Sequence, residues 1–164
     1  CFEALVTSAT CFDDVLVIVG REHEQVVAAL EGLNVRHAVN PDYETGMGSS
    51  FRTAVAALPE SAAALFALAD QPLLMASDYR RLLDAYRARP GGIIGVRYGE
   101  VTAPPHLFDR RYFPELSRLA HGARSVLQRH EPEMTVLPFD PARLLDVDTP
   151  DDYDRARAAL AGAQ

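Results

Sequence analysis

Short apolar runs alternate with amphipathic segments along this chain, and that alternation limits its fold more than any other feature. The run Val15–Val19 is rich in β-branched residues, which is typical of a strand buried on both faces. The next segment places Val26, Val27 and Leu30 on one helical stripe before Gly32, as expected for a helix that ends at a glycine. A buried strand followed by an amphipathic helix is the repeating unit of α/β proteins, so we predict an α/β fold.

The same alternation continues to the end of the chain. Further strands are expected at Val35–Val39, Leu65–Ala69, Ile93–Val96 and Met134–Leu137. Further helices are expected around residues 51–58, 79–86, 113–119, 123–130 and 153–160, with Ser49 or Ser50 capping the first of these helices and Ser77 the second. The stretch Val101–Asp109 contains Pro104 and Pro105, so we predict that it is not a central strand.

Composition and charge favour one globular domain that acts on small molecules. The chain has 164 residues, a 48% hydrophobic fraction and a net charge of −7, which suits a single core and argues against nucleic acid as a partner. No apolar run is long enough to span a membrane, and Cys1 and Cys11 lack metal-ligand spacing. We therefore expect one domain over residues 1–164, in a reducing, cytoplasmic compartment.

All 16 basic residues are arginine, and the chain contains no lysine. A mechanism that requires an ammonium group must therefore obtain it from outside this sequence. The same absence excludes a Walker-type phosphate loop, which depends on a lysine.

Polar residues that follow the apolar runs are the candidate site, because ligands of open α/β sheets bind beyond the carboxyl ends of the strands. The first group runs from Asn40 to Ser50, where Gly46 and Gly48 permit a tight backbone path. Ser49 and Ser50 open a helix whose free N–H groups suit a phosphate. An ordinary strand-to-helix loop explains the same residues.

Two aspartates form the second candidate group. Asp70 follows the expected strand Leu65–Ala69, and Asp148 lies in the acidic segment Asp146–Asp152. Carboxylates from two strand ends can bracket one Mg²⁺ ion, which keeps several waters and takes few protein ligands. A turn aspartate explains Asp70 equally well, and the start of a helix explains Thr149 to Asp152. Strand alternation is expected to put Asp146 and Asp148 on the same side.

Two histidines lie in connections where they can meet a ligand. His106 follows the two prolines, and His121 precedes Gly122. Each fits an ordinary loop residue as well as a binding residue.

Taken in order, these segments resemble the MobA-like nucleotidyltransferases, and most closely the molybdenum cofactor cytidylyltransferases, which transfer CMP from CTP to molybdopterin. The resemblance covers nearly all of the chain. It rests on the segments Asp13–Gly20, Asn40–Leu58, Ala69–Leu74, Pro105–Leu119, Gly122–Arg124 and Asp146–Asp152.

The resemblance implies a three-layer α/β sandwich with a mostly parallel, mixed sheet, a glycosyltransferase-A-like variant of the Rossmann architecture. It assigns Asp70 and Asp148 to catalysis and to Mg²⁺, and His106, Gly122 and Arg124 to the acceptor, with Arg124 pairing with its phosphate. It places five residues on the nucleotide side of the cleft: Asn40, Gly46, Gly48, Ser49 and Ser50. The implied reaction is in-line attack of an acceptor phosphate on the α-phosphorus, driven by positioning and charge neutralisation.

The sequence departs from the family pattern in two places, and these departures leave alternative functions open. The family opens with a strand and a Gly-rich loop that ends in Arg and Lys, and no segment here matches it, so we expect the domain to lack that strand and loop. Ala120-His121 stands where members often carry Gly-Asp. Besides a transferase using CTP or GTP, the sequence fits a non-catalytic module of molybdenum cofactor maturation that serves a molybdoenzyme or its chaperone, or a transferase with another phosphorylated acceptor.

Overall fold

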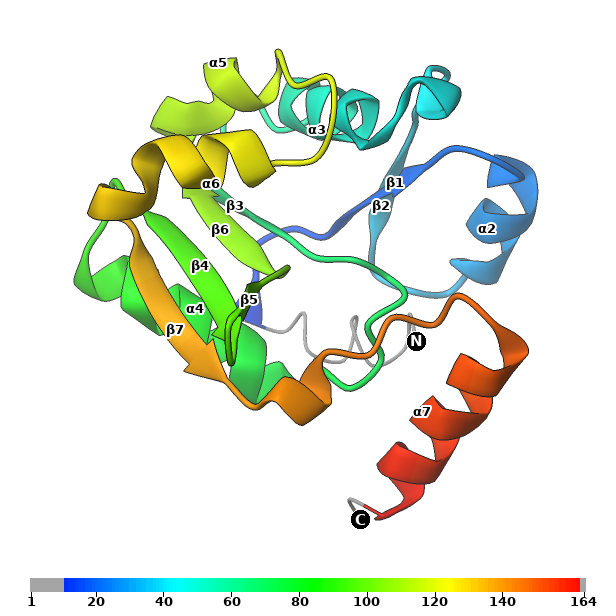
Figure 1. The fold of residues 1–164 in the computed structure, drawn as a ribbon. Helices are drawn as coiled ribbons and strands as arrows, with labels where there is room; N and C mark the ends of the chain where they lie inside the picture. Colours follow the sequence, from blue (N-terminus) through cyan, green and yellow to red (C-terminus); the bar gives the residue numbers. More distant parts are fainter. Residues whose placement is uncertain (1–10, 163–164) are drawn as a thin grey trace.

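The β-structure of the described residues is divided into two sheets. The computed structural model describes residues 11–162. β1 (Leu16–Val19) and β2 (Arg36–Val39) pair in parallel and form a two-stranded sheet of their own. The larger sheet contains β3 (Ala63–Phe66), β4 (Ile93–Tyr98), β5 (Val101–Thr102), β6 (His106–Asp109) and β7 (Thr135–Phe139). Figure 1 shows β1 and β2 beyond β3, on the side away from β4 and β7.

The larger sheet is mixed, as expected. β6 lies between β3 and β4 and is antiparallel to both. β7 runs parallel to β4, and the short β5 pairs antiparallel with the end of β4. Parallel and antiparallel pairs therefore occur together, in agreement with the predicted α/β class. Within residues 11–162, however, three of the four strand pairs of the larger sheet are antiparallel, so this sheet is not mostly parallel as expected.

Helices cover both faces of the larger sheet. In Figure 1, α3, α5 and α6 lie over one face, and α4 lies over the other. The helices are α2 (His23–Ala29), α3 (Met47–Ala56), α4 (Ala76–Ala88), α5 (Phe113–Leu116), α6 (Arg124–His130) and α7 (Pro150–Gly162). Short 3-10 turns occupy Tyr43–Thr45, Arg110–Tyr112, Glu131–Glu133 and Pro141–Arg143.

Alternation along β4 and β6 divides the core into two layers. Ile93 and Phe108 pack against residues of α5 and α6, whereas Ile94 and Leu107 pack with residues of α4. All four side chains are at most 1% exposed, and burial of one such side chain contributes about 1.5–3 kcal/mol. The three-layer sandwich expected from the sequence is therefore confirmed.

The prediction for Val101–Asp109 is wrong at the end of that stretch. His106–Asp109 forms β6, which has a partner on each side and is a central strand. Pro104 and Pro105 precede β6, so neither removes a donor from the ladder. Proline excludes its own position from a central strand, and the residues after it remain free to pair.

Two helices begin earlier than predicted. α3 starts at Met47 with Gly46 at its N-cap, so Ser49 and Ser50 lie in its first turns and do not cap it. α4 starts at Ala76, so Ser77 lies inside the helix; the Asp78 carboxylate accepts a hydrogen bond from the Met75 N–H instead. A side chain in the first turn replaces the expected serine cap of α4.

The acidic candidates stand on irregular segments and not at strand ends. β3 ends at Phe66, so residues 67–69 separate Asp70 from the strand. Residues 144–149 form no strand, so the alternation expected for Asp146 and Asp148 does not apply. Pairing with β6 sets the end of β3, because Phe66 is opposite His106, the first residue of β6.

α7 begins as predicted. Thr149 and Asp152 cap it reciprocally: the Thr149 N–H donates to the Asp152 carboxylate over 2.9 Å, and the Asp152 N–H donates to Thr149 Oγ1 over 3.3 Å. Ala156 is buried, but Tyr153 and Leu160 are 53% and 45% exposed. The apolar stripe of α7 is therefore only partly covered within residues 11–162.

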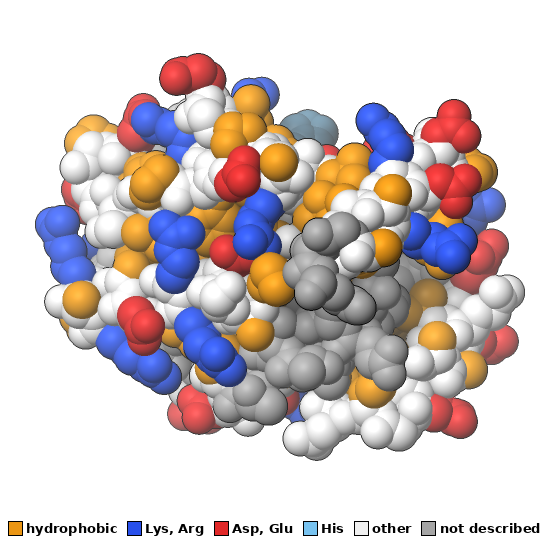
Figure 2. Space-filling view, turned by 90° about the horizontal axis from the view of Figure 1, so that it is seen from below, with side chains coloured by type: hydrophobic (Ala, Val, Ile, Leu, Met, Phe, Trp, Pro, Cys, Tyr) orange, Lys and Arg blue, Asp and Glu red, His pale blue; other side chains and the backbone are white. Residues whose placement is uncertain are grey.

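Arginine supplies the cationic surface of this fold. Figure 2 shows arginine side chains spread over the lower face of the molecule, with acidic side chains among them. Several also support the core from outside, as Arg81 does by lying 4.6 Å from the centre of the Phe139 ring and donating to Pro138 O. No helix within residues 11–162 is both long and apolar enough to cross a bilayer. Cys1 lies outside the described residues.

Candidate active site

Asn40 organises the first predicted group. It is 1% exposed, and its amide donates to Ser49 Oγ over 2.8 Å and to Ser50 Oγ over 3.1 Å. Its Oδ1 accepts from the Asp42 N–H, and Ser49 Oγ donates to Gly46 O over 2.8 Å. The end of β2 is therefore tied to the first turns of α3. In this structure these side chains order the loop, whose exposed residues 41–45 and 47 remain available to a ligand.

The residues predicted to bind the nucleotide lie against residues predicted to bind the acceptor. A Cβ on Gly48 would stand 2.3 Å from Leu119 O, and one on Gly46 would stand 3.5 Å from Ala120 O. A Cβ on Gly122 would contact Met47 Sδ at 3.3 Å. The start of α3 thus packs closely on the loop between α5 and α6. The structure brings together two groups that the sequence places about 70 residues apart.

Asp70 lies with Asp146 and Asp148 of the acidic segment. The Val147 N–H donates to Asp70 O over 2.9 Å, and Gln71 Nε2 donates to Asp146 Oδ1 over 3.0 Å. Asp70 Oδ1 and Gln71 Oε1 are buried, and neither has a hydrogen-bond partner within residues 11–162. These contacts place residues 70–71 beside residues 146–148. Sequence reasoning considered Asp146 without selecting it and missed Gln71, whose place directly after Asp70 was the available signal.

The electrostatics of this cluster suit a divalent cation. Burial raises the pKa of the Asp70 carboxyl above its ordinary value, and the charges of Asp146 and Asp148 raise it further. A bound cation would relieve the same repulsion and occupy the unpartnered oxygen. Residues 11–162 contain no cluster of three or more His, Cys, Asp or Glu side chains arranged for a metal, but Mg²⁺ requires only one or two carboxylates beside water and phosphate. The residues present therefore fit a Mg²⁺ ion that takes one or two carboxylates from the protein and its other ligands from water and phosphate.

An ion pair between the half-buried Arg143 and the buried Asp78 holds the two acidic segments together. Arg143 Nη1 lies 2.9 Å from Asp78 Oδ2 and also donates to Leu73 O over 3.0 Å. The Asp78 side chain is 7% exposed. Arg143 precedes the acidic segment and Asp78 follows Asp70, so this pair fixes one segment against the other. No spacing in the sequence connects these two residues, which are 65 positions apart.

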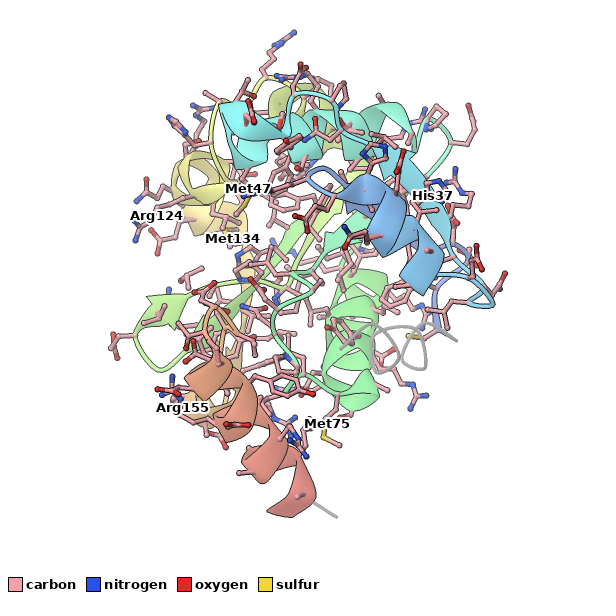
Figure 3. The ribbon with its side chains drawn as sticks, turned by 90° about the vertical axis from the view of Figure 1, so that its right-hand side faces the viewer. His37, Met47, Met75, Arg124, Met134 and Arg155 are labelled. Atoms are coloured by element: carbon pink, nitrogen blue, oxygen red, sulfur yellow. The ribbon has the colours of Figure 1, made fainter. Side chains whose placement is uncertain are left out.

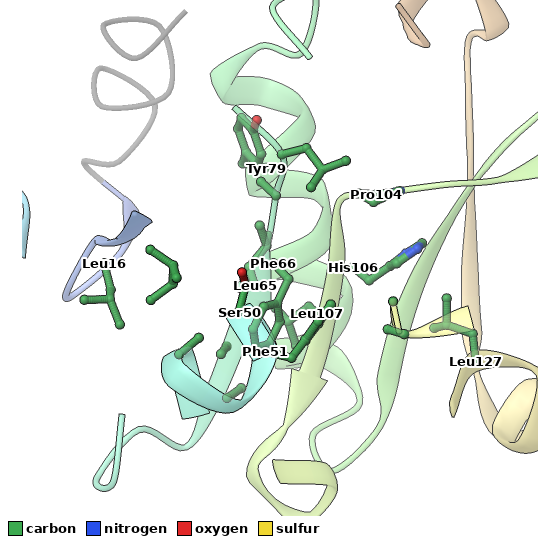
Figure 4. Close-up of a pocket in the computed structure, with 18 of the residues that line it drawn as sticks. Leu16, Ser50, Phe51, Leu65, Phe66, Tyr79, Pro104, His106, Leu107 and Leu127 are labelled. Carbon is green, nitrogen blue, oxygen red and sulfur yellow. The ribbon is translucent and has the colours of Figure 1, made fainter. Parts of the chain in front are cut away.

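His106 occupies the wall of a large cavity. The cavity has a volume of about 1370 Å³, and Figure 4 shows His106 on β6 with Leu127 nearby. His106 is 5% exposed, and its Nδ1 has no hydrogen-bond partner among the described residues. Burial lowers the pKa of its imidazole to about 4. The ring is therefore neutral at pH 7 and lies on a central strand, not in a loop.

Some of the predicted site residues line this cavity, and the others lie outside its lining. Ser50, His106, Gly122 and Arg124 line it. Arg124 is the exposed first residue of α6, and Figure 3 shows its side chain at the periphery of the molecule on the same side as Met47. No hydrogen bond within the described residues joins the Asn40–Ser50 group to Asp70. The structure therefore forms two half-sites, one around α3 and one around Asp70.

The fold and the acidic cluster define the class: a Rossmann-like α/β domain of the nucleotidyltransferase type. A nucleotidyl transferase from Methanothermobacter thermautotroptrophicus has the same fold, with a TM-score of 0.82 at 20% identity over 99% of this chain and 79% of that chain. Rv0371C from Mycobacterium tuberculosis H37Rv, solved in complex with manganese, has a TM-score of 0.73 at 30% identity, covering 93% of this chain and 82% of that one.

Sequence comparison identifies the family. The model of the MobA-like NTP transferase domain matches residues 3–134, and the chain belongs to that family. It is also 34% identical over 91 residues to nicotine blue oxidoreductase from Paenarthrobacter nicotinovorans, a match that covers 56% of this chain and 44% of the relative. The matched region is thus less than half the length of that relative.

Proposed function

We propose that this protein is a Mg²⁺-dependent nucleotidyltransferase that transfers CMP or GMP from the nucleoside triphosphate to a molybdopterin acceptor and releases pyrophosphate. Family membership supports nucleotidyl transfer, and a similar protein of known structure was solved with manganese. One relative is named as an oxidoreductase, so similarity alone does not decide the reaction. The observation that carries the proposal is the buried, unpartnered oxygen of Asp70 beside Asp146 and Asp148.

Each half-site has its own task under this proposal. Asp70 and Asp148 would hold Mg²⁺, which when bound neutralises charge on the triphosphate. The exposed loop before α3, which Asn40, Ser49 and Ser50 order, would bind nucleotide oxygens. Gly46, with its positive φ, would let this loop turn toward the nucleotide, and Gly48 would bring the loop between α5 and α6 close to the same place.

The acceptor would lie on the cavity side of the site. Gly122 and Arg124 stand next to the start of α3, and the Arg124 guanidinium can pair with an acceptor phosphate. Neutral His106 would contact the uncharged part of the acceptor from its buried position. No side chain is required as a nucleophile, because the acceptor phosphate attacks the α-phosphorus itself.

The direct test measures pyrophosphate release from CTP and from GTP with Mg²⁺ and molybdopterin. We expect Asp70→Asn to lower turnover by about a hundredfold or more, the usual effect of losing a group that stabilises transition-state charge. Asp84→Asn is the matched control, because Asp84 is an exposed carboxylate on α4 with a surface partner. Equal turnover by the Asp70→Asn and wild-type proteins would remove Asp70 from the mechanism.

A second candidate is a non-catalytic binding module of molybdenum cofactor maturation. The observation in its favour is that Asn40, Ser49 and Gly46 already satisfy one another. Titration calorimetry with CTP separates the two functions: the transferase should show nucleotide heat that depends on Mg²⁺ and is lost in Asp70→Asn. A pure binding module should show molybdopterin heat without it.

A further inference from the structure

The side-chain amide of Gln71 has a hydrogen-bond partner at only one of its two ends. Gln71 directly follows Asp70 and is 4% exposed. Its Nε2 donates to Asp146 Oδ1 over 3.0 Å, but its buried Oε1 has no hydrogen-bond partner within residues 11–162. Buried polar atoms in native proteins are nearly always paired, because an unpaired one loses water without compensation. The unpartnered oxygen of Gln71 therefore indicates a donor that the described residues do not supply.

Asp146 determines which end of this amide is left unpartnered. A carboxylate at neutral pH accepts hydrogen bonds and donates none. If the Gln71 amide were rotated by half a turn, its oxygen would face the Asp146 carboxylate, and two acceptors would repel each other. Asp146 therefore holds the amide nitrogen toward itself and directs the amide oxygen elsewhere.

The donors of the surrounding segments have other acceptors. Arg143, which precedes the acidic segment, directs its Nη1 to Leu73 O and to Asp78 Oδ2. The Thr149 hydroxyl, which follows this segment, donates to Asp152 over 2.7 Å. The missing donor for Gln71 Oε1 is therefore expected from a bound ligand or its water.

The neighbouring residue has the same deficit. Asp70 Oδ1 is also buried without a partner in the described part of the chain. The Val147 N–H donates to Asp70 O over 2.9 Å, and Figure 1 shows the segment before α7 beside the segment after β3. Two acceptors on consecutive residues suit a hydrated cation, because the ion binds a carboxylate directly while its waters donate to oxygens around it.

We propose that Gln71 is a positioning residue for the divalent metal: its Oε1 accepts a hydrogen bond from a water of the Mg²⁺ hydration shell, and Asp146 orients the amide for this contact. Asp146 then acts through Gln71 and is not itself a ligand of the metal. The inference rests on the proposed function, since it takes Asp70 as the residue that binds the metal. It adds a role for two residues that the proposed reaction leaves unassigned.

The test measures binding of Mn²⁺ alone to the 164-residue protein by electron paramagnetic resonance, without nucleotide and without turnover. Gln71→Met keeps the length of the side chain and removes its amide. We expect this variant to raise the Kd for Mn²⁺ by about tenfold or more, the usual effect of losing an outer partner of a metal site. Gln25→Met is the matched control, because Gln25 is exposed on α2, and it should leave the Kd unchanged.

A double-mutant cycle tests the part played by Asp146. Asp146→Asn should raise the Kd by about twofold or more, because the Gln71 amide is then free to adopt either orientation and only one is competent. Asp151→Asn removes an exposed charge at the start of α7 and controls for charge alone. In the Gln71→Met background, Asp146→Asn should have no larger effect than Asp151→Asn, since the amide it orients is absent. A purely structural role for Gln71 would lower stability in urea without this pattern in metal affinity.

Three outcomes would overturn the proposal. The first is a Kd of Gln71→Met equal to that of the wild-type protein. The second is an Asp146→Asn effect that persists in full in the Gln71→Met background, which would make Asp146 a direct ligand. The third is an Asp146→Asn effect no larger than that of Asp151→Asn; this comparison changes only exposed residues, so it decides the matter even if Gln71→Met does not fold.

Asp70→Asn separates this inference from the proposed function. If Asp70→Asn loses Mn²⁺ and Gln71→Met retains it, the role of Gln71 is wrong and the metal site of the proposed function stands. If Asp70→Asn binds Mn²⁺ as the wild-type protein does, the metal site itself is wrong, and the role of Gln71 falls with it.

Discussion

At the residue scale, glycine and histidine show how much one position depends on its surroundings. Gly48 has no positive φ that would demand glycine. It is required because the backbone of the loop between α5 and α6 leaves no room for a Cβ. His106 is required to be neutral because it is buried on a central strand. Neither the close contact at Gly48 nor the burial of His106 can be inferred from the neighbouring residues in the sequence.

Gly48→Ala should destabilise the protein by about 2 kcal/mol, the usual cost of overpacking a close contact. The added Cβ would stand 2.3 Å from Leu119 O, so the loop between α5 and α6 must move. Urea denaturation measures the change. Gly92→Ala is the control, since its Cβ would lie 3.8 Å from the nearest atom, Arg89 O. Equal stability of the two variants would contradict the close approach.

His106 should make stability fall as the solution becomes acidic. Its pKa in the fold is about 4, below the ordinary 6.5, so the unfolded chain binds the proton more readily. The contribution of neutral His106 to the free energy of unfolding is fully present above pH 6.5. It is lost as the pH falls toward 4, by up to about 3 kcal/mol.

Thermal or urea denaturation between pH 4 and 7 tests this, with His106→Gln compared with the wild-type protein. The wild-type minus variant difference should shrink as pH falls through this range. His37→Gln is the control, because His37 is exposed on β2. A difference that does not change with pH would show that burial of His106 carries no proton linkage.

At the element scale, most strands and helices follow from local pattern, and their ends follow from contacts. The β-branched run before Gly20 predicts β1, and the helical stripes predict α2, α4 and α6. The end of β3 depends on where β6 pairs with it, and the start of α4 depends on Asp78 and not on Ser77. The two prolines before β6 argue against a central strand in that part of the sequence, but β6 is central. The ladder needs donors only from the residues that follow them.

Arg143→Gln should lower stability by about 2 kcal/mol, because it leaves the buried Asp78 carboxylate without its cation. It should also raise the Mg²⁺ concentration needed for half-maximal turnover more than it lowers maximal turnover, since the segment carrying Asp148 is no longer fixed against Asp70. Denaturation and metal titration measure the two effects, and Arg143→Lys should restore part of both.

Arg87→Gln is the matched control for this prediction. Arg87 and Asp84 form an exposed pair on α4, with side chains 66% and 73% exposed, and such pairs contribute about 0–1 kcal/mol. If Arg143→Gln and Arg87→Gln are equally stable, the Arg143–Asp78 pair does not stabilise the contact between the two acidic segments.

At the scale of the whole molecule, the dominant feature is that one α/β sandwich is built around two sheets. Helices close both faces, so the cavity between β1 and β3 is bounded on four sides by chain and side chains. Ser50 on α3 and His106 on β6 line this cavity together, so elements far apart in the sequence share it.

The sequence by itself determined the α/β class, the order of most elements and the candidate residues at their ends, because short-range periodicity and turn chemistry decide these locally. It also predicted the family, and residues 3–134 bear this out. The roles of the site residues remain proposals. Tertiary structure alone decided that Asp70 lies with Gln71 and Asp146, that Arg143 pairs with Asp78, and that β6 is central. It alone showed the cavity between β1 and β3. Each of these depends on residues far apart in the chain, whose contact follows from packing and burial and not from any local pattern.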